Sequence, residues 1–122
     1  MRVTPQGALL AFVGGCGNPN FAYVEYARVA SPPGTFTADL SDVTVAVAVS
    51  ARADATAYDD SGDLMLGDLD LVPEDSRVME IENSARSRVV FTGISAGTTL
   101  IAVLLDGRRV GTVGGHVVRQ RP

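Results

Sequence analysis

Several residue types that carry specialised chemistry are scarce in this 122-residue chain or missing from it. It has no tryptophan, no lysine, one histidine and one cysteine, so an internal disulfide is impossible and few side chains suit nucleophilic or acid–base catalysis. No run of 18 or more apolar residues is long enough to cross a bilayer as a helix. We therefore expect a single domain that is not an enzyme and holds no cofactor.

Charge is distributed unevenly along the sequence. Residues 1–83 hold four arginines and thirteen acids, which gives −9, whereas residues 84–122 hold six arginines and one acid, Asp106, which gives +5. The overall charge of −4 repels phosphate groups, and the arginine-bearing segment lacks interleaved aromatic residues for stacking on bases. We expect no nucleic-acid partner.

What the chain does contain is the pattern of β-strands. The stretch Val89–Leu105 holds two β-branched, apolar runs separated by a small-residue turn, and the second run meets Asp106-Gly107, a strong hairpin signal. We expect three consecutive antiparallel strands there. Period-2 alternation also covers residues 43–58, 64–72 and 78–83, and turn signals recur every 8 to 12 residues. The pattern predicts an all-β sandwich of about seven antiparallel strands.

Two further expectations follow from a sandwich. Adjacent prolines in Ser31-Pro32-Pro33-Gly34 cannot belong to a central strand, so they favour an extended connector that takes the first strand from one sheet edge to the other. Late strands of a sandwich also pair beside the middle ones. Much of the charge asymmetry is therefore expected to cancel between neighbouring strands.

The N-terminus has the order of an export signal. Arg2 precedes a short apolar stretch, Ala8–Val13, and small residues lead directly to the lone Cys16. Val13-Gly14-Gly15-Cys16 resembles the lipobox of bacterial lipoproteins, in which the cysteine becomes the lipidated first residue of the mature chain. The resemblance implies export and membrane anchoring through acyl chains on Cys16.

Two other interpretations of this cysteine remain open at the level of sequence. Leu9–Val13 can be an edge strand that leads into a glycine-rich turn, with Cys16 as a small buried hydrophobe. A reactive thiol is disfavoured, because no neighbour in the sequence would lower its pKa.

Three ordered motifs carry a second resemblance: Ala55–Gly62, Asp75–Ile81 and Val90–Ile101. Together they resemble the successive signatures of bacterial Ig-like domains of the group-2 type, which implies an Ig-like Greek-key β-sandwich. That family usually has a tryptophan on its third strand, where this chain has only aliphatic residues.

The expected core comprises Leu69, Leu71, Phe91, Ile101 and Val103. The implied organisation is a signal and lipobox segment at 1–16, a tether and possible first strand at 17–27, and the Ig-like domain at 28–122.

Candidate chemistry in the sequence is sparse. The turn Asp59-Asp60-Ser61-Gly62-Asp63 offers three carboxylates for calcium. It lacks the spaced Asp-x-Asp-x-Asp-Gly order of a calcium loop and the bidentate Glu that follows such a loop. A solvated turn is therefore favoured, and no metal site is assigned. His116 lies between a glycine and a valine and is expected to be a terminal strand residue. Arg108 and Arg109 are expected at an exposed hairpin tip.

The expected function is that of an exported, lipid-anchored Ig-like module at the bacterial cell envelope, with a structural, adhesive or protein-interaction role. Its partner is expected to be a protein or a polysaccharide. The alternatives are a small carbohydrate- or calcium-binding module, or an Ig-like appendage of a phage particle. Aromatic residues discriminate the structural or adhesive role from carbohydrate binding, because a sugar-binding face presents stacked rings. Only Phe21, Tyr23, Tyr26 and Tyr58 could do so here.

Overall fold

The computed structural model describes residues 20–120, which form nine β-strands and one short 3-10 helix. The elements in chain order are β1 (Phe21–Ala30), β2 (Phe36–Ala38), β3 (Asp42–Ala46), β4 (Ser50–Asp59), β5 (Leu69–Pro73), β6 (Met79–Ser84), η1 (Ala85–Ser87), β7 (Arg88–Gly93), β8 (Gly97–Leu105) and β9 (Arg108–Val118). Within these described residues, no helix has the length and apolar character needed to span a membrane.

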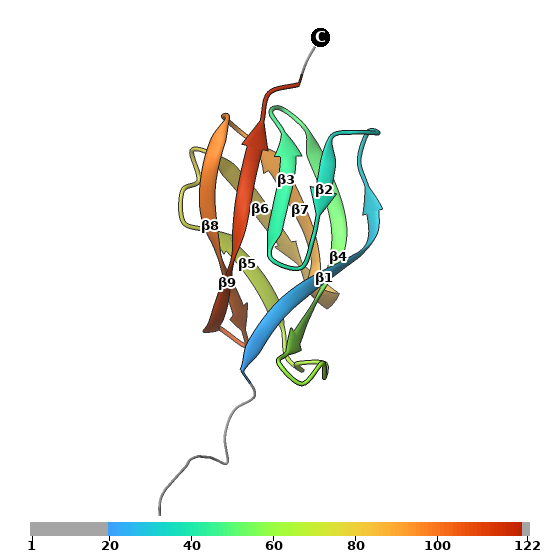
Figure 1. The fold of residues 1–122 in the computed structure, drawn as a ribbon, viewed down its shortest axis with the longest axis vertical. Helices are drawn as coiled ribbons and strands as arrows, with labels where there is room; N and C mark the ends of the chain where they lie inside the picture. The colour runs from blue at the N-terminus through green and yellow to red at the C-terminus, as the bar shows by residue number, and fades with distance from the viewer. Residues whose placement is uncertain (1–19, 121–122) are drawn as a thin grey trace, which may run out of the picture.

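The strands form two sheets that pack face to face (Figure 1). One sheet has the order β1-β4-β7-β6, and the other has the order β2-β3-β9-β8-β5. This arrangement confirms the predicted all-β sandwich. It has nine strands instead of about seven, and β3 and β9 run parallel, with Asp42 opposite Gly114 and Ala46 opposite Val118.

The expectation of three consecutive paired strands was wrong in one respect. β8 and β9 form the predicted antiparallel hairpin through Asp106-Gly107, but β7 pairs with β4 and β6 instead of β8. The turn after Gly93 carries the chain from one sheet to the other. Gly93 lies directly against the backbone of Ala46 in the opposite sheet, and a side chain there would collide with it. Local patterning predicts strands, whereas this crossing depends on a close approach between the two sheets.

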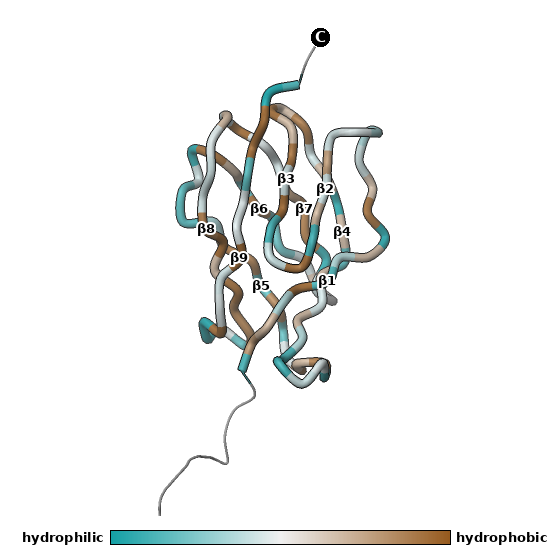
Figure 2. Tube along the Cα trace, in the orientation of Figure 1, coloured by the Kyte–Doolittle hydropathy of each residue, from teal (hydrophilic) through white to brown (hydrophobic). Residues whose placement is uncertain are grey.

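The core lies between the sheets, and every core residue named from the sequence is buried. Leu71, Phe91, Ile101 and Val103 are fully buried, and Leu69 is nearly so. Along most of β4 the inner face carries small side chains, namely alanines at positions 51, 53, 55 and 57. These leave space for larger residues from the other strands to interdigitate. Apolar residues accordingly follow the strands in Figure 2.

Aromatic rings fill part of that space. Phe91 on β7 contacts Tyr26 edge to face, with ring centroids 5.7 Å apart, and Phe36 with centroids 5.5 Å apart. The Tyr26 hydroxyl is buried and has no hydrogen-bond partner among residues 20–120. Burial raises the pKa of this phenol well above its usual range.

The proline-containing connector and the charge distribution agree with expectation. Residues 31–35 take the chain from β1, at the edge of one sheet, to β2, at the edge of the other. Two of the late arginines contact early acids: Asp54 contacts Arg88, and Glu74 contacts Arg109. β1 begins at Phe21 and ends at Ala30, so it runs across the predicted boundary between tether and domain.

The sandwich has two ends, which are named here by the chain terminus nearest to each. At the N-terminal pole, the start of β1, the connection of residues 60–68 and the β8–β9 turn come together (Figure 1). At the C-terminal pole, the end of β9 lies with the β3–β4 and β7–β8 connections. The chain therefore enters and leaves the sandwich at opposite ends.

Candidate interaction surfaces

Cys16, the predicted lipidation site, lies outside the described residues, as does the whole segment 1–16. The first described residue, Asn20, is fixed at the N-terminal pole by two hydrogen bonds to Asp60. Its carbonyl oxygen accepts from the Asp60 backbone N–H at 3.0 Å, and its side-chain nitrogen donates to Asp60 Oδ2 at 3.4 Å. Three residues separate the predicted anchor from this attachment.

The acidic loop at residues 59–63 is a tight turn built around one carboxylate. Asp59 is only 6% exposed, and its Oδ1 accepts hydrogen bonds from the backbone N–H groups of Ser61 at 2.9 Å and Asp63 at 3.0 Å. The Asp59 backbone N–H also donates to the Asp63 carbonyl at 2.9 Å. Within residues 20–120, no group of three or more His, Cys, Asp or Glu side chains is arranged to hold a metal ion. The hydrogen bonds favour the interpretation of this loop as a turn.

The four aromatic residues considered for sugar binding divide into two pairs. Tyr26 packs on the core, and Phe21 lies over Gly111 on β9, where a side chain would collide with the ring. Tyr23 and Tyr58 are opposite each other on β1 and β4, on the outer face of their sheet. Their rings stack with centroids 5.1 Å apart and planes 19° apart. Of the four rings considered for sugar binding, only the half-exposed pair Tyr23 and Tyr58 therefore remains available.

That pair has an apolar neighbour. Leu64 forms an isolated antiparallel bridge with Tyr58, so its side chain lies on the same outer face as the two tyrosines. Leu66 follows two residues later and is 82% exposed, while Leu64 is 52% exposed. We call Tyr23, Tyr58, Leu64 and Leu66 the pole patch. Exposed apolar side chains gathered at one end of a domain are typical of a contact with a partner or a membrane.

The leucines of the pole patch were predicted to belong to a strand, and this was wrong. The alternation over 64–72 suggested one continuous strand, but β5 begins only at Leu69. Gly67 has φ +134°, which breaks the extended backbone, and a side chain on it would come within 2.8 Å of the Asp106 carboxylate. The backbone turn at Gly67 separates residues 64–66 from β5, and Asp106, far along the chain, lies beside that turn.

His116 and Asp42 form a polar pair on the outer face of the five-stranded sheet. His116 Nε2 lies 3.0 Å from Asp42 Oδ1, and both side chains are about two-fifths exposed. The Asp42 carboxylate also lies over Gly114, where a side chain would displace it. The position of His116 within β9 confirms the prediction that it is a strand residue.

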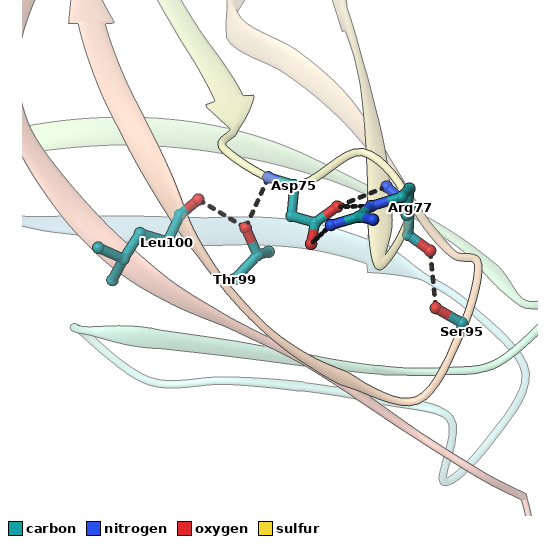
Figure 3. A network of polar contacts seen from close by, with 5 residues as sticks. All are labelled: Asp75, Arg77, Ser95, Thr99 and Leu100. Atoms are coloured by element: carbon teal, nitrogen blue, oxygen red, sulfur yellow. Dashed lines mark hydrogen bonds and ion pairs between the residues drawn. The ribbon is translucent and has the colours of Figure 1, made fainter.

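At the C-terminal pole a polar network fixes the β5–β6 connection to β8 (Figure 3). The Asp75 backbone N–H donates to Thr99 Oγ1 at 2.9 Å, and the Asp75 carboxylate accepts from Arg77 Nε at 3.0 Å and Nη2 at 3.2 Å. Ser95 Oγ donates to the Arg77 carbonyl at 2.7 Å. The Arg77 side chain, together with its backbone N–H, lowers the pKa of Asp75. The polar groups of this network form hydrogen bonds with one another.

The two arginines after the hairpin turn are both exposed, as expected. Arg109 Nη2 contacts Glu74 Oε2 at 3.0 Å across the outer face of the five-stranded sheet. Arg108 instead lines a hollow of about 510 Å³ at the N-terminal pole, together with Leu64, Leu66, Leu105 and Val110. The hollow continues the apolar surface of the pole patch toward the β8–β9 hairpin.

No protein-family model matches the chain, and no curated protein matches it in sequence. Its fold is similar to domains of the surface layer protein SbsC. With a structure of SbsC domains 4 and 5 it shares 19% identity at a TM-score of 0.53, covering 87% of this chain and 57% of that one. With SbsC domains 4–9 it shares 19% identity at a TM-score of 0.56, covering 90% of this chain and 16% of that one.

These SbsC structures contain several domains, and this chain spans between about one-sixth and somewhat more than half of their length. At this identity the likeness concerns the fold: a β-sandwich of the kind found as one unit in a surface layer protein.

Proposed function

We propose that the chain is a structural module of the bacterial cell surface, held at the envelope by acyl chains on Cys16 and presenting its sandwich to a protein or polysaccharide. It has no enzymatic role in this proposal. The observation that carries it is the short spacing between the lipobox-like Val13–Cys16 and β1, which begins at Phe21. A lipidated cysteine there would leave only a brief tether before a rigid domain.

Two features support a structural role. The chain enters at one pole and leaves at the other, so the sandwich extends away from the point of attachment (Figure 1). The fold is also the one used for domains of a surface layer protein. Fold alone does not determine function, so the anchoring and the outward display are the parts of the proposal that need direct tests.

The anchoring is tested by metabolic labelling with a fatty-acid analogue in cells that express the wild type or Cys16→Ala. We expect label on the wild type, no label on the variant, and release of the variant from the membrane fraction. Cys16 is the only cysteine, so the variant removes the only thiol of the chain. Absence of label from the wild type, with the protein in the cytosol, would reject the envelope assignment and favour the phage-particle alternative.

A carbohydrate-binding role is the second candidate, and the stacked Tyr23 and Tyr58 rings favour it. Aromatic faces bind sugars through stacking, and both rings lie on an outer sheet face. Partial loss of water contact, followed by the nearby Glu25 carboxylate, raises the pKa of the Tyr58 phenol. Binding to envelope polysaccharide that is lost in Tyr58→Ala but kept in Phe36→Leu would support this role. Equal binding by both variants would contradict it.

A further inference from the structure

The most exposed large apolar side chains at the N-terminal pole are held outward by the structure. Leu64 and Leu66 flank Met65, whose backbone N–H donates to the Ala57 carbonyl at 2.9 Å and whose side chain packs on the core. Because the Met65 side chain points toward the core, the side chains of Leu64 and Leu66 point toward solvent. The loop therefore presents its leucines on a defined backbone.

A clamp to the β8–β9 turn holds the other side of this loop. The Asp68 backbone N–H donates to Asp106 Oδ1 at 2.9 Å, and the Asp106 backbone N–H donates to the Asp68 carbonyl at 2.9 Å. Because the loop is tied at both ends, little conformational entropy remains to be lost when the leucines meet a partner. This pre-organisation is typical of a binding surface.

The position of the chain entry indicates which partner is near. Asn20 is hydrogen-bonded to Asp60, and Asp60 lies four residues before Leu64. The path from Cys16 to Asn20 is at most about 14 Å when fully extended. A lipid on Cys16 would therefore bring the pole patch to the bilayer surface.

We propose that the pole patch rests in the boundary between headgroups and acyl chains of the bilayer that holds the anchor. This inference rests on the proposed lipid anchoring. Leu64 and Leu66 enter the apolar side of the boundary, and Tyr23 and Tyr58 lie at headgroup level, where amphipathic rings are favoured. The patch fixes the orientation of the sandwich, so that the C-terminal pole points outward.

Charges around the patch determine which lipids it accepts. The exposed acids at this pole are Asp60, Asp63, Asp68 and Asp106, with Glu25 beside Tyr58, and Arg108 is the cation in the adjoining hollow. This excess of carboxylates is repelled by anionic headgroups over roughly a Debye length. The proposal is therefore specific for a bilayer with zwitterionic headgroups.

The chain offers a clean test because it has one cysteine and no tryptophan. The full chain carrying Leu66→Trp is coupled through Cys16 to a maleimide lipid in phosphatidylcholine vesicles, with or without brominated acyl chains that quench tryptophan. Ile94→Trp is the matched control, since Ile94 is exposed at the C-terminal pole. Chemical coupling makes this test independent of natural acylation, which the labelling experiment measures separately.

We expect brominated lipid to reduce the emission of Trp at position 66 about twofold, with a shift to shorter wavelength, and to leave position 94 unchanged. Replacing a third of the lipid with phosphatidylglycerol should reduce the quenching at position 66. Equal emission at position 66 with and without bromine would overturn the proposal and indicate a protein partner for the patch. Stronger quenching in anionic vesicles would overturn the stated lipid preference.

Discussion

The leucines of one short segment have opposite surroundings. Leu69 and Leu71 point into the core and are 4% and 0% exposed, whereas Leu64 and Leu66, a few residues earlier, are 52% and 82% exposed. Residue type and local alternation are the same in both pairs. Gly67 and the carboxylate of Asp106 separate them, because the turn at Gly67 ends the alternation before β5 begins. The comparison shows that position relative to this turn decides whether a leucine stabilises the fold or is available to a partner.

The largest expected effect comes from the core side of the comparison. Leu71→Ala should lower the free energy of unfolding by about 2–5 kcal/mol, because a fully buried side chain is lost and leaves a cavity. Urea denaturation followed by circular dichroism measures this. A loss below 1 kcal/mol would show that the two sheets pack more loosely around Leu71 than its burial indicates.

The boundary between the two pairs is tested by Gly67→Ala. The added Cβ would come within 2.8 Å of the Asp106 carboxylate, and the backbone φ of +134° is strained for any residue other than glycine. We expect a loss of about 1–3 kcal/mol in the same denaturation experiment. Gly62→Ala is the matched control: its φ is +83°, but its Cβ would meet nothing within 4 Å. Equal losses in the two variants would mean that backbone strain alone, without the Asp106 contact, explains the effect.

The support beneath the pole patch is tested by Asp59→Ala. This change removes the acceptor for the Ser61 and Asp63 N–H groups and should cost about 1–2 kcal/mol. Amide hydrogen exchange at Ser61 and Asp63 should become faster than in the wild type. Unchanged exchange at both amides would show that the turn does not depend on this carboxylate.

The C-terminal pole provides a polar counterpart with a small, pH-dependent effect. The pKa of Asp75 is held below its ordinary value of 3.8, with the Arg77 side chain as the largest cause. Its contribution to stability is therefore fully present above that value and is lost as pH falls through the lower, folded-state pKa. In Arg77→Gln, a carboxyl NMR titration should show the Asp75 pKa returning toward its ordinary value. An unchanged pKa would assign the shift to the hydrogen bond from the Arg77 backbone N–H.

Sequence patterning predicted much of the fold because strand faces depend on local alternation. Leu69, Leu71, Phe91, Ile101 and Val103 were all placed correctly in the core. Local alternation does not specify which strand pairs with which. The parallel β3–β9 pair and the separation of β7 from β8 therefore could not be predicted, since both depend on contacts between segments distant in the chain.

The pole patch was missed for a related reason. Its leucines have the same period-2 spacing as the strand that follows them, and the glycine at position 67 was the one local signal of a break. The decisive contact, from Asp106 to the backbone of Asp68, joins residues 38 positions apart. Tyr23 and Tyr58 were considered as candidates from composition, but their stacking follows from the β1–β4 register.

The most direct test of the account compares the wild type with the double variant Leu64→Ser, Leu66→Ser by thermal melting. Each protein is measured free in solution and coupled through Cys16 to phosphatidylcholine vesicles. The account predicts that the free proteins differ by no more than about 0.5 kcal/mol, because both leucines are exposed. Coupling should raise the melting temperature of the wild type only, since a surface that binds the folded state stabilises it. A large loss of stability in the free variant, or an equal effect of vesicles on both proteins, would contradict the account.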